Sequence, residues 1–314
     1  MTRLFAPLLL AAVIGVPSGA LQTSAPAARV ERGGPRIRID AVAVDRKGGP
    51  VVDLRPEEVE VWIGHFRVPT QAFTVVTPAS DEGRLIVLVL DDLTTPLQFG
   101  ARGKDAAQRF VNRLLPGDRM AIVTLNGSAM DSTDDKGRLL RMIDAAPLQS
   151  AGSIPADRLG AHVLTTISAL ARQMAEASDR RKTIVAIGSG WLFDRPMPPP
   201  AVGIDPRKEW IGAMQAMALA NVNLYVLDPA GLGTRSVDTG GNGFARETGG
   251  LAFIGTNDLS GAVDRILGES ANYYLLDVGD PPVGRGADLR ELDVRVLRPG
   301  VTIRARRTIV GGAR

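Results

Sequence analysis

The stretch Leu85-Ile-Val-Leu-Val-Leu90, followed at once by Asp91-Asp92-Leu-Thr-Thr95, decides the predicted fold. Six consecutive apolar residues are typical of a strand that is buried on both faces of a parallel sheet. The abrupt change to acidic and hydroxyl side chains marks the carboxyl end of that strand. Because a parallel sheet needs helical crossovers, the rest of the chain should alternate between strands and helices.

That alternation is present on the C-terminal side of this stretch. Apolar runs predict further strands, and amphipathic segments between them predict helices, the last of which is expected to be capped by Asn257. Short connections join these elements, so the sequence predicts an α/β fold with a Rossmann-like, doubly wound, mostly parallel sheet. The expected strands are at 120–125, 183–187, 222–227, 251–254 and 273–278, and the expected helices at 107–114, 139–143, 163–174, 211–218 and 259–267.

Both ends of the chain show a different pattern, in which apolar and polar residues alternate with a period of two. This is the signature of half-buried strands. It occurs at 59–63 and again at 292–296 and 301–305, and a β-branched run lies at 37–44. We expect these terminal strands to pair into one small β-sandwich-like module, formed by residues 36–79 and 286–308. The α/β domain, residues 83–279, is then an insertion within that module.

The first residues predict export from the cytoplasm. Arg3 precedes the apolar stretch 8–16, and Ser18 and Ala20 provide small residues for cleavage after Ala20, so residues 1–20 are expected to be a signal peptide. Residues 21–35 are expected to be a flexible leader. The mature chain, which has no later apolar stretch long enough to span a membrane, is expected to be periplasmic or secreted.

Composition excludes several classes of function. The chain has 314 residues and no cysteine, which rules out disulfides, thiolate metal sites and cysteine nucleophiles. Its net charge is only +3 and it has no long run of Lys or Arg, so we expect no nucleic-acid partner. The arginines between 285 and 307 alternate along predicted strands and are expected to form one exposed face.

Polar side chains follow three of the expected parallel strands. Asp91, Asp92, Thr94 and Thr95 follow the first, Ser189 follows the strand at 183–187, and Asp228 follows the strand at 222–227. Ligands of open α/β sheets bind beyond these carboxyl ends. Such oxygen donors would suit a hard cation such as Mg²⁺. Alternatively, Asp92 and Thr94 cap the following helix and Asp228 initiates a turn.

These segments resemble von Willebrand factor A (VWFA) domains, and more specifically the VWFA-related domain proteins of the acidobacterial type. The similarity is diffuse but collinear from about Ile37 to Arg307. It is carried by Leu85-Ile-Val-Leu-Val-Leu-Asp-Asp-Leu-Thr-Thr95, Leu115-Pro-Gly-Asp-Arg-Met-Ala-Ile-Val123, Arg181-Lys-Thr-Ile-Val-Ala-Ile-Gly-Ser-Gly190, Asn221-Val-Asn-Leu-Tyr-Val-Leu-Asp-Pro-Ala-Gly-Leu232, Glu247-Thr-Gly-Gly250 and Tyr273-Tyr-Leu-Leu276.

The resemblance implies a non-enzymatic binding domain with a metal-ion-dependent adhesion site of the form Asp-x-Ser-x-Ser, completed by a later Thr and Asp. Asp91 matches the first Asp and Thr95 the second hydroxyl. Leu93 stands where the first hydroxyl belongs, and Ser189 stands in place of the later Asp. The implied metal site, Asp91, Thr95 and Ser189, is therefore degenerate, and we expect no cofactor and no tight binding of Mg²⁺ or Mn²⁺.

The resulting prediction is an exported interaction protein that holds a protein partner through loops at the carboxyl ends of the strands. Trp191 and Phe193 are the expected aromatic anchors, aided by Asp92, Thr94 and Asp228. The alternative role of the two aromatic residues is core packing. The alternative function is a serine hydrolase using Ser189, with His162 as its base, although Ile187 occupies the leading glycine position of Gly-x-Ser-x-Gly.

Overall fold

The computed structural model describes residues 36–80, 83–147, 156–177, 181–189, 206–232, 241–279 and 288–310. The chain divides into two units, Met1–Gly33 and Gly34–Arg314, and every described residue belongs to the second. The predicted signal peptide and leader lie outside the described residues. None of the described helices is both long and apolar enough to cross a membrane.

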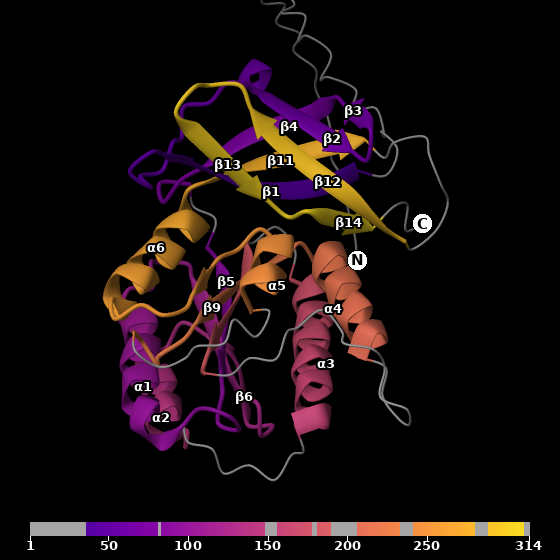
Figure 1. Ribbon diagram of the computed structural model, residues 1–314. Helices are drawn as coiled ribbons and strands as arrows, with labels where there is room; N and C mark the ends of the chain where they lie inside the picture. Colours follow the sequence, from indigo (N-terminus) through magenta and orange to yellow (C-terminus); the bar gives the residue numbers. More distant parts are fainter. Residues whose placement is uncertain are drawn as a thin grey trace, which may run out of the picture. The chain divides into compact units, whose positions relative to one another are not determined.

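The central sheet has six strands and confirms the fold class that the sequence predicts (Figure 1). Its order is β10-β9-β8-β5-β6-β7, with all neighbours parallel except β6 and β7. Numbered within this domain and read from β7, the order is 3-2-1-4-5-6, as in doubly wound nucleotide-binding folds. The strands are β5 Leu85–Leu90, β6 Arg119–Thr124, β7 Ala129–Thr133, β8 Lys182–Ile187, β9 Val222–Leu227 and β10 Ala252–Phe253.

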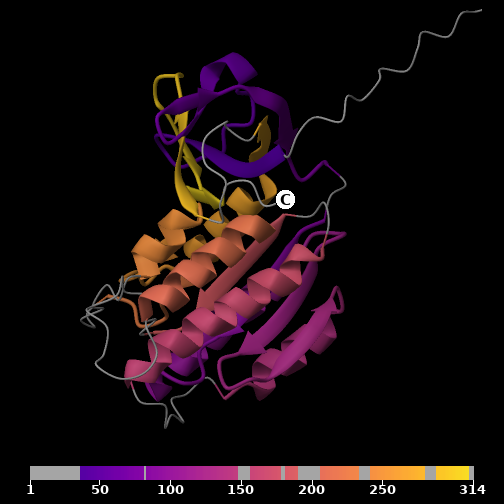
Figure 2. The ribbon, with the colours of Figure 1, turned by 90° about the vertical axis from the view of Figure 1, so that its right-hand side faces the viewer.

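Helices cover both faces of this sheet, which explains why all six residues of β5 and of β9 are buried. One face packs against α1 Leu97–Asn112, α2 Lys136–Ala145 and α6 Leu259–Ala271. The other packs against α3 Ala156–Ala175, α4 Pro206–Ala220 and α5 Gly241–Glu247. Figure 2 shows α3 and α4 side by side in front of the sheet. The N-cap of α6 is Asp258, which accepts a hydrogen bond from the backbone N–H of Gly261, one residue after the predicted cap Asn257.

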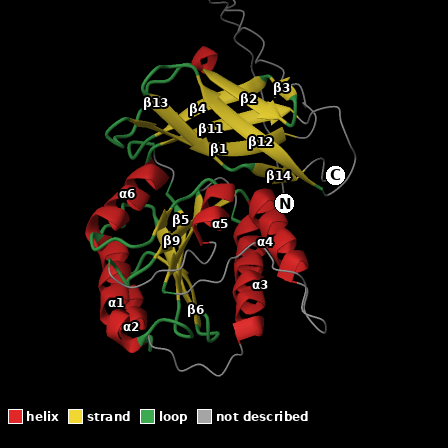
Figure 3. Ribbon diagram, in the orientation of Figure 1, coloured by secondary structure: helices red, strands yellow, loops and turns green. Residues whose placement is uncertain are grey.

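The terminal strands form the predicted β module, in two antiparallel four-stranded sheets around a common apolar core (Figure 3). The expected pairing of the two ends of the chain is confirmed, because β13 pairs with β1 and β12 pairs with β2. The first sheet has the order β13 Val301–Ala305, β1 Arg36–Asp45, β11 Tyr273–Gly279 and β4 Thr70–Val76. The second has the order β14 Thr308–Val310, β12 Leu289–Val296, β2 Val59–Ile63 and β3 Phe66–Val68. A short 3-10 helix, η1 Pro56–Glu58, precedes β2.

One strand lies in a different sheet from the one that the sequence predicts. The sequence predicts residues 273–278 as the last strand of the α/β series, but β11 pairs with β1 and β4 in the β module. The physical reason is its period of two: Tyr274, Leu276 and Val278 are buried in the core of the module, while Asp277 forms an ion pair with Arg38. A strand of the central sheet would need apolar residues on both faces.

The arginines near the C-terminus do not form one exposed face, contrary to the expectation. Arg304 donates from Nε to the carbonyl oxygen of Gly249 (3.0 Å), just beyond α5. Arg306 is buried and donates to the carbonyl oxygens of Met217 and Ala218 in the last turn of α4. The last carbonyls of a helix have no partner within it, and the negative end of the helix dipole attracts a cation. These two arginines therefore attach the β module to the α/β domain.

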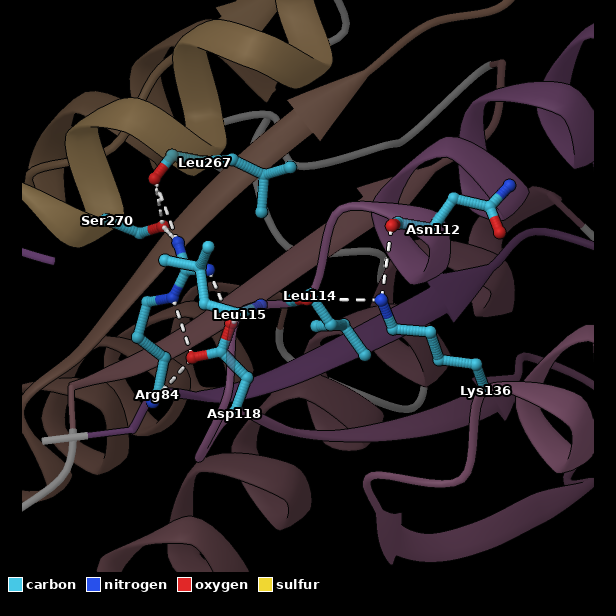
Figure 4. A network of polar contacts seen from close by, with 8 residues as sticks. All are labelled: Arg84, Asn112, Leu114, Leu115, Asp118, Lys136, Leu267 and Ser270. Carbon is cyan, nitrogen blue, oxygen red and sulfur yellow. Dashed lines mark hydrogen bonds and ion pairs between the residues drawn. The ribbon is translucent and has the colours of Figure 1, made fainter. Parts of the chain in front are cut away.

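A third arginine makes the same kind of contact at the amino end of β5 (Figure 4). Arg84 donates to the carbonyl oxygen of Leu267 in α6 (2.9 Å) and to the hydroxyl of Ser270 (2.8 Å), and it forms a buried ion pair with Asp118. Lys136 occupies the end of α1 in a similar way, donating to the carbonyl oxygens of Asn112 and Leu114. Basic side chains thus satisfy helix ends throughout this side of the sheet.

Candidate functional site

Three neighbouring strand ends bring the predicted polar residues together. In the parallel register Leu90 lies beside Ile187, and Ile187 lies beside Leu227. The residues that follow these positions are therefore adjacent at one edge of the sheet, which we call the crest. We refer to the five side chains that interact there as the crest cluster: Asp91, Thr94, Thr95, Ser189 and Asp228.

Asp91 is the centre of the crest cluster and is fully buried. Its Oδ1 accepts hydrogen bonds from the backbone N–H groups of Leu93 (3.1 Å) and Thr94 (2.7 Å). Its Oδ2 accepts a hydrogen bond from the hydroxyl of Thr94. Both carboxylate oxygens are thus occupied by donors of the loop that follows β5, and the carboxylate holds that loop in a tight turn.

The remaining contacts join the three strand ends to one another. The Thr94 hydroxyl lies 2.7 Å from the carbonyl oxygen of Ser189, and the backbone N–H of Ser189 donates to the Thr95 hydroxyl (3.2 Å). The Ser189 hydroxyl donates to Oδ1 of Asp228 (2.7 Å), which also accepts from the backbone N–H of Ala230 (2.9 Å). The predicted turn at Asp228 is therefore present, and the cluster forms a continuous hydrogen-bonded chain.

Asp92 lies outside the crest cluster and does not cap a helix. It is 2% exposed, and its Oδ1 accepts a hydrogen bond from the backbone N–H of Asn126 (2.9 Å), in the loop after β6. The N-cap of α1 is Pro96, which no side chain caps, so the alternative helix-capping role of Asp92 and Thr94 is wrong. The carboxylate instead connects the loops that follow β5 and β6.

Burial raises the pKa of Asp91, and the hydrogen bonds from Thr94, Leu93 and Thr95 only partly oppose this effect. A carboxyl group whose pKa is raised in the folded state binds its proton more tightly there than in the unfolded chain. Its charge therefore lowers stability as pH rises above the unfolded value of about 3.9. Burial therefore disfavours the charged form of Asp91 at the centre of the crest.

The oxygens of the crest cluster are largely taken up by hydrogen bonds within the chain. Such an ion needs several oxygens with free lone pairs to replace its water, yet both oxygens of Asp91 already accept hydrogen bonds from the chain. The Ser189 hydroxyl directs its hydrogen to Asp228. Among the described residues, no three His, Asp or Glu side chains come close enough together to hold a metal ion.

Ser189 and His162 have different partners. The Ser189 hydroxyl donates to Asp228, whereas Nε2 of His162 lies 2.7 Å from the carbonyl oxygen of Leu125. His162 is half-buried rather than a fully exposed surface residue. A nucleophilic serine requires a base within hydrogen-bond reach of its hydroxyl. In the described part of the chain, Ser189 is therefore not paired with His162, the base of the serine hydrolase alternative.

Sequence reasoning missed two exposed leucines at the crest. Leu97, at the start of α1, is 71% exposed, and Leu232, after Asp228, is 68% exposed. Arg102 of α1 donates to the carbonyl oxygen of Ala230 (3.4 Å), so the two segments that carry these leucines are connected. No periodic signal marks either residue, because exposure depends on neighbours from other strands. The predicted anchors Trp191 and Phe193 lie outside the described residues.

No protein-family model matches the chain, and no curated protein matches it. Among solved structures, an aerotolerance-related membrane protein of Bacteroides fragilis has a TM-score of 0.42 at 15% identity, covering 60% of this chain and 98% of that one. Proximal thread matrix protein 1 of the mussel byssus has a TM-score of 0.42 at 13% identity, covering 62% of this chain and 49% of that one. The manganese-loaded TRAP protein of Plasmodium vivax has a TM-score of 0.37 at 10% identity, covering 75% and 96%.

The strand order and the antiparallel edge strand β7, rather than the neighbours, carry the assignment to the doubly wound class. The acidobacterial relationship stays a prediction from the sequence.

Proposed function

We propose that this chain is an exported, non-enzymatic interaction protein that binds a protein partner through the crest of its α/β domain. The observation that carries this proposal is the contrast between Leu97 at the start of α1 and Leu232 after β9, which are both exposed, and the largely buried crest cluster. Two exposed aliphatic side chains beside hydrogen-bonded strand ends suit a protein surface better than a small polar substrate.

We propose further that partner binding needs no metal ion. Support comes from the occupied oxygens of Asp91, which hold the loop after β5 in place of coordinating a cation. In this proposal the role of the carboxylate is to stiffen the surface before the partner arrives. A loop that is already ordered loses less conformational entropy on binding. Trp191 and Phe193 remain the proposed aromatic part of the same surface.

Removal of the exposed leucines should weaken partner capture. The purified chain would be immobilised and exposed to native envelope extract, and retained proteins identified by mass spectrometry. We expect the double variant Leu97→Ser/Leu232→Ser to reduce capture of the retained partner at least tenfold, since each buried leucine contributes about 1.5–3 kcal/mol. Trp191→Ala/Phe193→Ala should have a similar effect, and neither variant should lower the melting temperature.

The matched control is Leu297→Ser, because Leu297 is 57% exposed and lies in the β module, after β12. It should retain full capture. Equal capture by the crest variants and this control would overturn the proposed surface. A large loss of stability in Trp191→Ala/Phe193→Ala would instead assign those two residues to the core.

Conservative neutralisation of Asp91 separates the structural role from a metal role. Asp91→Asn keeps Oδ1 as an acceptor for Leu93 and Thr94, and its new amide can donate to the Thr94 hydroxyl, whose hydrogen is then available to the carbonyl oxygen of Ser189. Because the variant also removes an unfavourable buried charge, we expect its unfolding free energy at pH 7 to lie within about 1 kcal/mol of wild type. Partner capture should also persist.

The same pair of proteins tests the metal proposal directly. Calorimetric titration with Mg²⁺ or Mn²⁺ should show no micromolar binding to wild type. Micromolar binding that disappears in Asp91→Asn, together with loss of capture in EDTA, would show that the adhesion site uses an ion.

A further inference from the structure

A buried group of charged side chains lies at the other end of the sheet from the crest, where the β module meets the amino ends of β8 and β9. We call Asp40, Arg181, Asn221 and Arg306 the junction cluster. Asp40 comes from β1, Arg181 directly precedes β8, Asn221 directly precedes β9, and Arg306 follows β13. The three charged residues are each 3% exposed.

The contacts connect the four residues into one network. Asn221 donates from Nδ2 to Oδ1 of Asp40 (2.8 Å), and its Oδ1 accepts from Nη2 of Arg306 (2.7 Å). Arg181 forms an ion pair with Asp40, at 3.6 Å between Nη1 and Oδ2, and its guanidinium lies 4.2 Å above the ring of Tyr273. Every member thus has a fixed position within the network.

Several donors in this network nevertheless have no acceptor. Within the described part of the chain, no group accepts a hydrogen bond from Nε, Nη1 or Nη2 of Arg181, or from Nε of Arg306. The phenol oxygen of Tyr225 lies near enough to favour the Arg181 charge, but without hydrogen-bond geometry. Buried guanidinium groups that leave four nitrogens unsatisfied are unusual, and each calls for a bound water or ion.

The charges of the network do not balance. Two guanidinium groups share a single carboxylate, so the buried cluster carries one excess positive charge. The neighbouring Glu269 already forms ion pairs with Arg304 and Arg265 and does not correct it. An isolated charge in the interior is strongly unfavourable unless a counter-ion is present.

The excess positive charge of the junction cluster lies on Arg306. Burial, together with the charge of Arg181, lowers its pKa to about 10, and Asp40 only partly compensates. Asp40 serves as the direct counter-ion of Arg181, with which it forms the ion pair. Arg306 has only carbonyl and amide oxygens as partners, and no acidic group contacts it among the described residues.

We propose that the junction cluster binds a small inorganic monoanion, with chloride as the physiological candidate, between the free nitrogens of Arg181 and Nε of Arg306. Water can accept hydrogen bonds from these nitrogens but cannot neutralise the charge. A monoanion does both, and its single charge equals the excess. The nearly complete burial of both side chains restricts the ligand to a monatomic or similarly compact anion.

The anion should stabilise the folded chain by mass action, since only the folded state assembles the network. The melting temperature of the full chain would be measured in sodium chloride and in sodium gluconate at equal ionic strength, because gluconate is too large for the site. We expect a saturable rise with chloride, on the order of 5 °C at saturation. Identical melting temperatures in the two salts at every concentration would overturn the proposal.

Three variants distinguish a specific site from a general salt effect. Arg181→Gln removes the excess charge and should abolish the chloride-dependent shift. Asp40→Asn keeps an acceptor for Asn221, raises the excess to two charges, and should enlarge the shift. Arg295→Gln, at an exposed position paired with Asp293, is the matched control and should retain the wild-type shift. An equal chloride effect in all three variants would show that no such site exists.

Anomalous diffraction from the wild-type chain tests for the anion even if a variant fails to fold. A crystal of the wild-type chain grown in bromide should show one anomalous peak within hydrogen-bond distance of Arg181 and Arg306. Ordered water without anomalous signal at this position would exclude the anion and assign the free donors to solvent.

Discussion

Replacing Asp118 with alanine is expected to lower the free energy of unfolding by about 3–5 kcal/mol, as is typical when one partner of a buried ion pair is removed. The Asp118 carboxylate accepts from the backbone N–H and the guanidinium of Arg84 and from the backbone N–H of Leu115. The side chains of Arg84 and Asp118 are 5% and 2% exposed, so water cannot replace the lost carboxylate. Denaturant unfolding should show a lower midpoint with an unchanged slope.

The control is Asp293→Ala, which breaks the ion pair with Arg295. Both of these side chains are about half exposed, and the change should stay within about 0.5 kcal/mol. A loss of the same size in both variants would contradict the argument from burial. The double variant Arg84→Met/Asp118→Leu should recover part of the stability, because it leaves no unpaired charge.

Asp118 should also affect how the stability of the chain depends on pH. Burial alone would raise the pKa of Asp118, but the hydrogen bonds and charge of Arg84 outweigh it and lower the pKa below the ordinary value. A carboxyl group with a lowered pKa stabilises the fold above the unfolded value of about 3.9, and this contribution is lost as pH falls through the folded pKa. Wild type should therefore lose stability more steeply in acid than Asp118→Ala does.

Replacing Gly188 with alanine is expected to destabilise the chain by about 3 kcal/mol or more, at the upper end of the range for overpacking. A Cβ at this position would lie 2.2 Å from Cβ of Asp91 and 2.7 Å from its Oδ2. Gly188 follows β8 directly, and Asp91 follows β5, so relief of the clash requires the two strand ends to separate. The hydrogen bonds from Thr94 to Ser189 and from Ser189 to Thr95 would then be lost. Thermal and denaturant unfolding both measure this effect.

Substitution of a matched glycine should change the stability in the opposite direction. Gly212 lies inside α4, and a Cβ there would meet no atom within 4 Å. Gly212→Ala should therefore stabilise the chain by about 0.5–1 kcal/mol through helix propensity. Equal effects of the two substitutions would contradict the proposed close contact. In Asp91→Gly/Gly188→Ala the clash is removed, so the double variant should be more stable than the sum of the two single changes predicts.

The arrangement of the crest was partly predictable. A buried parallel strand that ends in Asp91 places that residue at the carboxyl edge, and the same reasoning places Ser189 and Asp228 beside it. The hydrogen-bond partners of the individual crest oxygens were not predictable, because the conformation of the loops decides them. The Thr94 hydroxyl donates to the Asp91 carboxylate, whereas Asp92 accepts from a different loop.

The sequence by itself determined the doubly wound sheet and the pairing of the two ends of the chain, since both follow from local periodicity, which records how many faces of each strand are buried. Only the tertiary structure decided the position of residues whose local sequence pattern suits more than one environment. Tyr273–Gly279 entered the β module instead of the central sheet, and Arg304 and Arg306 turned inward to helix ends. Leu97 stayed exposed. In each case the outcome depends on partners distant in sequence, whose carbonyls, charges and surfaces exist only after the chain has folded.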